Sequence, residues 1–206
     1  RKTKYEDLTA IWQRIEKAWK IYEPLPQTVE EAAVWKDFVP AWNAWKGDHE
    51  QYLQLCQEYD AAKIINPVAF EAKIRKFDTD HFRFVETLAT SIISKSDFEG
   101  QCDPTQCAFG KWLAGEEARQ VENPVVAAAL RDIVETHKHL HESAGEIREI
   151  LKAGKEADAV AKAGEIYTAK TVPAVTENQK YLNTMIGETT RIVDIYNKMV
   201  DQALSV

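Results

Sequence analysis

The sequence has few of the residues that interrupt or cross-link a chain: 3 cysteines, 8 glycines and 7 prolines among 206 residues. Three cysteines are too few for a disulfide-stapled scaffold and leave at least one thiol unpaired within the chain. The scarcity of glycine and proline favours long helices over many short strands joined by turns. No stretch approaches the ~20 apolar residues that span a bilayer, and no signal peptide is present.

Positive charge is also in short supply. Lysine and arginine number 26 against 33 aspartates and glutamates, which gives a net charge of −7. This acidic balance lacks the electrostatic footprint of a nucleic-acid binder, so we expect no nucleic-acid partner. The sequence shows no Ser-His-Asp order, phosphate loop or haem attachment motif, and we therefore predict that the chain is not an enzyme. Because it begins at Arg1 rather than Met, we expect it to be part of a longer protein.

Apolar residues at alternating steps of three and four form long helical seams at both ends of the chain. The first seam ends at Pro24 and Pro26, and Thr28 with Glu31 predicts a capping box for the next helix. The three seams consist of residues Leu8, Ile11, Ile15, Ala18, Tyr22 and Leu25; Trp35, Phe38, Trp42, Trp45, His49, Tyr52, Cys56 and Tyr59; and Val172, Val175, Gln179, Leu182, Ile186, Thr189, Val193, Tyr196, Val200 and Ala203. Pro173 predicts a kink or the first turn of the last helix.

The middle of the chain predicts a smaller group of helices. Asn66-Pro67 marks a helix boundary. Asp103-Pro104 reads as an N-cap followed by proline at the first position of a short helix ending near Gly115, and Asn123-Pro124 opens another helix in the same way. No segment alternates as a strand does. We therefore predict an all-α fold: a long up-and-down helical bundle formed by residues 1–69 and 156–206, with a smaller helical bundle inserted at residues 70–155.

Three histidines lie on apolar helix faces of this insert. His137 and His141 are four residues apart and share one helix face, a spacing that lets two imidazoles reach one metal ion. His81 lies between Phe77 and Phe84 on the apolar face of its own helix. Buried imidazoles need hydrogen-bond partners or a metal, so each is either a ligand or a satisfied core histidine. His139 points away from His137 and His141 and is expected to be exposed.

Cys107 is the fourth candidate. If Asp103 caps the short helix, Cys107 lies in its first turn, where the helix dipole and free amides favour a thiolate. A thiolate and three neutral imidazoles are a plausible ligand set for tetrahedral zinc. The alternative is a disulfide between Cys102 and Cys107.

In chain order, these residues resemble the chemoreceptor zinc-binding domain. The shared features are His81 with Phe84 three residues later, the segment Cys-Ala-Phe-Gly-Lys-Trp from residue 107, and His137-Lys-His-Leu-His141. The resemblance covers residues 70–152 and implies zinc as cofactor, with His81, Cys107, His137 and His141 as ligands.

The flanking seams resemble the four-helix-bundle sensor region of methyl-accepting chemotaxis proteins. The resemblance covers Tyr5 to Leu55 and rests on Tyr22-Glu-Pro-Leu, Glu30-Glu31 and Trp35. It implies a homodimer, tethered to the membrane in the full-length receptor, and a final helix that runs toward a membrane span. A domain inserted in such a bundle is expected in the periplasm, with the cytoplasm as the alternative.

We therefore predict a sensor domain of a bacterial transmembrane chemoreceptor that binds zinc and signals by helix displacement. One alternative is a metal-free helical bundle that senses a small molecule, with Trp35, Trp42 and Trp45 lining the pocket. The other is a hemerythrin-like di-metal protein, which requires several carboxylate ligands at helical spacing.

Overall fold

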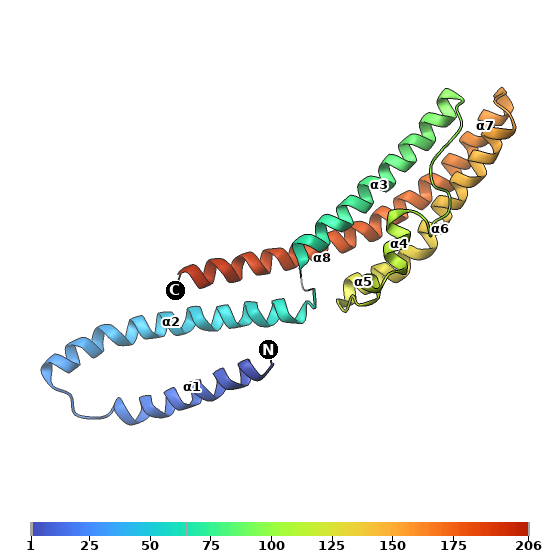
Figure 1. The fold of residues 1–206 in the computed structure, drawn as a ribbon. Coiled ribbons are helices and arrows are strands. Elements are labelled where there is room, and N and C mark those ends of the chain that lie inside the picture. The colour runs from blue at the N-terminus through green and yellow to red at the C-terminus, as the bar shows by residue number, and fades with distance from the viewer. Residues whose placement is uncertain (1, 65, 206) are drawn as a thin grey trace. The chain divides into compact units, whose positions relative to one another are not determined.

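The computed structural model describes residues 2–64 and 66–205, and all the regular structure in these ranges is helical (Figure 1). The predicted all-α helical bundle is confirmed. The helices divide into two compact units, one ending at Glu50 and the other spanning Gln51–Ser205. Each unit is described by itself.

The first unit is an α-hairpin of α1 (Lys2–Tyr22) and the first part of α2 (Val29–Ala61). The predicted capping box is confirmed: the Thr28 N–H donates to Glu31 Oε2 at 2.8 Å, and the Glu31 N–H donates to Thr28 Oγ1 at 3.2 Å. Aromatic rings join the two helices, with Trp12 against Trp42 and Trp19 against Trp35. Across residues 4–50 every side chain is at least partly exposed, so the hairpin has an aromatic seam but no enclosed core.

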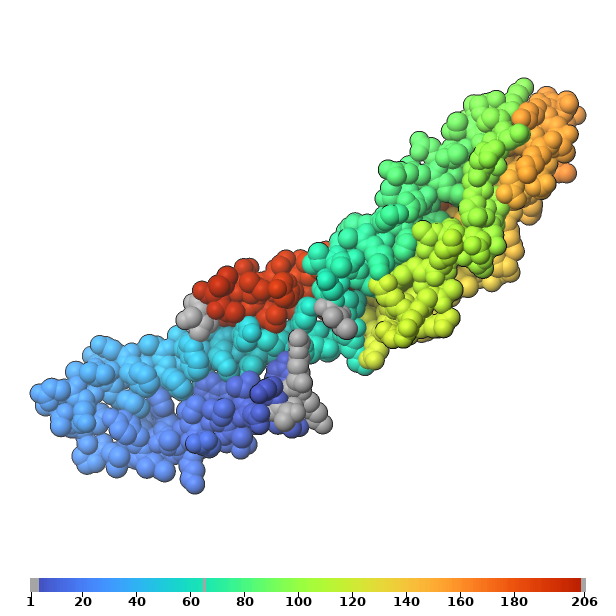
Figure 2. Space-filling model, in the orientation of Figure 1, coloured from blue at the N-terminus to red at the C-terminus, as the bar shows by residue number. Residues whose placement is uncertain are grey.

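The second unit contains the remaining helices. These are the end of α2, α3 (Pro67–Ser94), α4 (Ala108–Ala114), α5 (Glu116–Arg119), α6 (Pro124–Ala153), α7 (Ala157–Ile166), the π-helical turn η1 (Tyr167–Thr171) and α8 (Val172–Ser205). Helix α8 packs along both α3 and α6, and together they form the frame of this unit (Figure 1). In Figure 2 the green-to-yellow segment that contains α4 and α5 lies against the green surface of α3.

Two apolar clusters fill the second unit. The first joins α3, α4, α6 and α8 and includes Ile74, Phe109, Ile133 and Met185. The second lies nearer the α3–α4 loop and α7 and includes Leu88, Phe98, Ile147, Leu151 and Ala163. Among the described residues, no buried side chain belongs to both clusters.

The units of the structure divide the chain differently from the predicted domains. Residues 156–206 were expected to pair with residues 1–69, yet residues up to Ser205 share a unit with the predicted insert 70–155. The reason is that Leu182, Met185, Ile186 and Ile192 of α8 join the same apolar cluster as α3 and α6. The assignment of the flanks to a sensor-type bundle stays a prediction.

Candidate metal centre

Helix α3 positions His81. The helix begins at the predicted boundary: Pro67 occupies the first turn, and Asn66 caps the helix, its Oδ1 accepting the Ala69 N–H at 3.0 Å. Phe70, Ile74, Phe77 and His81 then follow at steps of four, three and four, and all are buried. The Nδ1 of His81 is 2.7 Å from the Phe77 carbonyl oxygen. A carbonyl only accepts, so Nδ1 carries the proton and Nε2 presents a lone pair.

Helix α6 positions His137 and His141. Asn123 caps this helix by accepting the N–H groups of Val125 and Val126, each at 3.0 Å, as its sequence predicts. Both imidazoles are buried, whereas the side chain of His139 is 58 % exposed, as expected for the opposite face. His141 Nδ1 is 2.7 Å from the Gln101 carbonyl oxygen, which fixes its proton on Nδ1 and leaves Nε2 free.

Cys107 differs from its predicted place. It is the N-cap of α4 rather than a residue of the first turn, and the Gly110 N–H donates to its Sγ at 3.2 Å. Asp103 instead closes a local turn by accepting the Thr105 N–H at 2.8 Å. Cys107 thus performs the capping role that was expected of Asp103, and α4 begins at the next residue, Ala108.

The three-dimensional packing explains the Cys-x-Phe-Gly-x-Trp segment. Phe109 is 1 % exposed and sets its ring at right angles to the imidazoles of His81 and His137, at 5.5 and 5.0 Å. A Cβ on Gly110 would lie 1.8 Å from the Pro104 carbonyl oxygen, so only glycine permits this close approach. Trp112 packs on Phe77, with ring centroids 5.4 Å apart.

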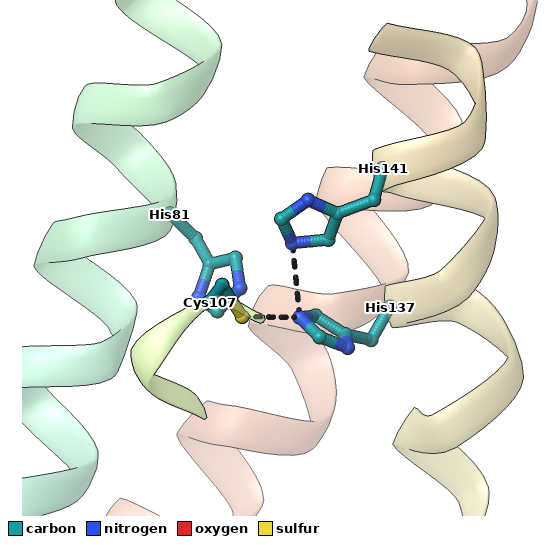
Figure 3. Close-up of side chains that lie close together, drawn as sticks. All are labelled: His81, Cys107, His137 and His141. Atoms are coloured by element: carbon teal, nitrogen blue, oxygen red, sulfur yellow. Dashed lines mark hydrogen bonds between the residues drawn. The ribbon is translucent and has the colours of Figure 1, made fainter. Parts of the chain in front are cut away.

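The four candidates converge from three elements (Figure 3). One ligand atom from each of His81, Cys107, His137 and His141 lies within 4.8 Å of the others. His137 Nε2 is 3.3 Å from Cys107 Sγ and 3.1 Å from His141 Nε2, the two contacts dashed in Figure 3. The structure thus brings together the four predicted ligands.

All three histidines are held neutral. Burial lowers the pKa of His137 to about 3, with the neighbouring His81 and His141 imidazoles adding to the effect. Burial likewise lowers the pKa of His141 to about 4, against the opposing hydrogen bond to Gln101, and lowers the pKa of His81. Burial raises the pKa of the Cys107 thiol, and the backbone amides of Gly110 and Phe109 oppose that rise. Neutral imidazoles are the form that binds metal, whereas the thiol must lose its proton.

The residues present fit a metal ion. His81 Nε2 is buried without a hydrogen-bond partner, and burying such an acceptor has a free-energy cost unless something binds it. His141 Nε2 is an unprotonated acceptor facing His137 Nε2 and, beyond it, a thiol. Electron pairs from several groups therefore point into one space, an arrangement that a cation stabilises.

The three cysteines are free thiols in this structure, so the alternative Cys102–Cys107 disulfide is not formed. Cys102 packs against the second apolar cluster and Cys107 against the first. His49, by contrast, lies far along the chain in the aromatic seam of α1 and α2, where its ring contacts Trp12 and Trp45.

The sequence did not reveal that the backbone carbonyls of Phe77 and Gln101 contact two of the candidate imidazoles. Both orient a ligand imidazole, yet a backbone acceptor leaves no side-chain signal. The cue for Phe77 is its place four residues before a buried histidine on one helix. Gln101 has no comparable cue, because its position depends on the path of the loop between α3 and α4.

Comparison with known proteins adds one match. Residues 81–148 match the family model of the chemoreceptor zinc-binding domain, a range that includes the four clustered residues. No curated protein and no solved structure matches the chain significantly. Within the described ranges, no helix combines the length and apolar character that crossing a membrane requires.

The match corrects the predicted location. The periplasmic location is wrong, because chemoreceptor zinc-binding domains are cytoplasmic domains of chemoreceptors. The error came from inferring the compartment from the flanking helical seams and their resemblance to a sensor bundle. Periodicity of this kind specifies helix packing and says nothing about the compartment.

The resemblance inferred from His81, the Cys107 segment and the His137–His141 pair is confirmed by an independent family model. The same residues form a cluster suited to a metal ion. Residues 81–148 of this chain match the family of chemoreceptor zinc-binding domains.

Proposed function

We propose that this domain binds one zinc ion through Nε2 of His81, His137 and His141 and Sγ of Cys107, and that the chain is a sensory segment of a chemoreceptor-type signalling protein. The observation that carries the proposal is the convergence of four ligand atoms within 4.8 Å. The family match supports the choice of zinc.

The donor set favours a closed zinc site. Three imidazoles and one thiolate fill the four positions of tetrahedral zinc, whereas catalytic zinc sites keep one position open for water or substrate. Zinc held by these residues would supply a cross-link between α3, the start of α4 and α6. We therefore propose a sensing role rather than catalysis, with metal occupancy setting the positions of these helices.

Support for zinc over a hemerythrin-like di-metal site comes from the donor types. Di-iron helical bundles use several inward-facing carboxylates. Among the described residues, the cluster with metal-binding geometry consists of three histidines and one cysteine and includes no carboxylate.

A second candidate function is small-molecule sensing in the first unit. The observation that favours it is a groove of about 430 Å³ along the aromatic seam of α1 and α2. Its lining is Ile15, Ala18, Trp19, Tyr22, Trp35, Phe38 and Trp42. Of the predicted pocket residues, Trp35 and Trp42 line this groove, which suits an apolar or aromatic ligand.

We further propose that the full-length protein is a membrane-tethered, methyl-accepting chemoreceptor that works as a homodimer. The resemblance of Tyr5 to Leu55 to chemoreceptor sensor regions supports this context. A family match in the same chain to a domain named for chemoreceptors adds weight to it.

Metal analysis tests the zinc site. We expect about one zinc per chain, measured by plasma mass spectrometry on reduced protein at neutral pH, and loss of tight binding in Cys107→Ala and His141→Ala. The matched control is His139→Ala, which removes an exposed imidazole from the same helix and should keep the zinc. Circular dichroism verifies that each variant is helical. Undiminished zinc in both ligand variants would refute the assignment.

A further inference from the structure

Along α6 the metal centre lies between the two apolar clusters, at a level where Leu140 is also buried. The two apolar clusters lie on either side of it along α6: Ile133 precedes His137 in one cluster, and Ala144 follows His141 in the other. On this stretch of α6, two further polar side chains, Thr136 and Ser143, hydrogen bond to the helix that runs beside it. These side chains and the imidazoles thus form a polar layer beside the buried Leu140 at the level of the metal centre.

The helix that receives these contacts contains an irregular turn. Elements α7, η1 and α8 follow one another without a break, because the backbones at their junctions, Tyr167 and Val172, are both right-handed helical. Within η1 the hydrogen bonding widens by one residue: the Val172 N–H donates to the Tyr167 carbonyl, five residues back. Turns of this π type are rare in helices and occur often at functional sites.

Pro173 provides a physical cause for the turn. It has no N–H, and in a regular α-helix its ring would clash with the carbonyl of Ala169, four residues earlier. Widening the preceding turn relieves that clash. Pro173 lies in the first turn of α8, one of the two predicted places, and α8 continues from the π turn η1 without a break.

The polar contacts from α6 lie on both sides of Pro173. The hydroxyls of Ser143 and Thr171 are 2.9 Å apart, and both residues are buried. Thr171 is the last residue of the π turn. Thr136, the residue before His137, donates from Oγ1 to Asn178 Oδ1 at 2.6 Å. The helix that presents two imidazoles to the metal centre is therefore bonded to the π turn and to the residues that follow it.

Asn178 leaves part of this layer unsatisfied. It is 1 % exposed, and its Nδ2 is buried without a hydrogen-bond partner. A buried donor without a partner is a position where a small shift of the helices can gain a hydrogen bond. The layer thus has two polar contacts and an unpartnered NH₂ group with two N–H donors, rather than a fully satisfied network in a single arrangement.

We propose that η1 is a two-register joint that connects metal occupancy to α8. With the metal centre filled, α6 is fixed against α3 and α4, and the Ser143–Thr171 and Thr136–Asn178 contacts hold the π turn. Without metal, α6 is released, these contacts loosen and the turn changes register. Because Pro173 disfavours a regular α-helical turn before it, the change of register is a shift of the wide turn along the chain rather than its loss, and the apolar face of α8 stays against α3 and α6. The proposal rests on the proposed zinc site and specifies how its state reaches the longest helix of the unit.

Hydrogen exchange with zinc and after chelation tests the joint. Amide exchange of residues 166–178 is followed by mass spectrometry on the whole chain, and the zinc content of the same samples is measured in parallel. In wild type we expect chelation to speed exchange in this segment at least about fivefold, the lower end of typical coupling between sites. The zinc-dependent difference is the readout, because a merely structural contact would change exchange equally in both states.

Variants at Thr171 distinguish the effect of the side-chain hydroxyl from the effect of the side-chain shape. Thr171→Val keeps the branched shape without the hydroxyl and should abolish the zinc-dependent difference, whereas Thr171→Ser keeps the hydroxyl and should retain it. Thr184→Val is the control, because its exposed hydroxyl bonds only to the Lys180 carbonyl of its own helix. By reciprocity, Thr171→Val should also weaken zinc binding about fivefold or more, and Thr184→Val should not. Ser143→Ala repeats the test from α6 if Thr171→Val does not fold.

The outcomes distinguish two failures. If wild type binds no zinc, the proposed function fails, and the joint fails with it. If wild type binds one zinc but residues 166–178 exchange equally with and without it, the zinc site stands and the joint is refuted. Retention of the full zinc-dependent difference in both Thr171→Val and Ser143→Ala would also overturn the proposal.

Discussion

Acidification should destabilise the metal-free protein well above the pH at which carboxylates titrate. His137 and His141 have pKa values of about 3 and about 4 in the folded chain, against 6.5 for an ordinary histidine. Below pH 6.5 the unfolded chain therefore binds protons that the folded chain does not. Each proton that binds the unfolded chain alone favours unfolding. The free energy of unfolding is therefore greatest above pH 6.5 and falls as the pH decreases.

The size of the effect follows from linkage. Between pH 6.5 and 5.5 each histidine whose folded pKa lies far below this range contributes a loss of about 1 kcal/mol. His137 and His141 together give about 2 kcal/mol, and the lowered pKa of His81 acts in the same direction. Carboxylates add little in this window because their ordinary pKa values are near 4.

Urea denaturation in the presence of a chelator measures this loss, with circular dichroism at pH 7.5, 6.5 and 5.5. His137→Leu should reduce the pH dependence by about one histidine's share, whereas His139→Ala should leave it unchanged because His139 is exposed. A free energy of unfolding that is the same at pH 6.5 and 5.5 would show that the three imidazoles are not buried neutral together.

Three further predictions concern metal affinity, packing and assembly. Zinc affinity should rise about tenfold per pH unit between pH 6 and 8, measured by chelator competition, because the Cys107 thiol with its raised pKa must release one proton; a flat profile would contradict this. Gly110→Ala should lower the thermal midpoint and the zinc content because its Cβ meets the Pro104 carbonyl, whereas Gly187→Ala, with open space around its Cβ, should raise stability by about 0.5–1 kcal/mol. Sedimentation should detect a weak homodimer that Ile11→Glu dissociates, since Ile11 lies on the first seam and is 47 % exposed; a strict monomer at high concentration would count against it.

Helical spacing predicted part of the candidate cluster. Residues four apart share a helix face, so His137 and His141 could be placed together before the fold was known. The position of Asn123-Pro124 likewise determined where that helix begins. These features depend on local sequence, which a single chain displays directly.

The features that were missed depend on the path of the backbone or on competition between caps. Asp103 and Cys107 both suit a helix start, and only the close approach of Gly110 to Pro104 shows that the sulfur is the cap. The last seam was assigned to the flanks because its steps of three and four do not specify a partner. Its partners are α3 and α6, which the apolar residues of α8 reach across the first apolar cluster.

The placement of the tryptophans determines what optical experiments can report. Five of the six, all but Trp112, belong to the hairpin of α1 and α2, where their rings contact one another. Intrinsic fluorescence of the intact chain therefore reports mainly on the hairpin and is a poor probe of the candidate metal centre. Replacing those five by phenylalanine leaves Trp112 as the single fluorescent tryptophan. Its ring centroid lies 6.0 Å from that of Phe109, which in turn contacts the imidazoles of His81 and His137.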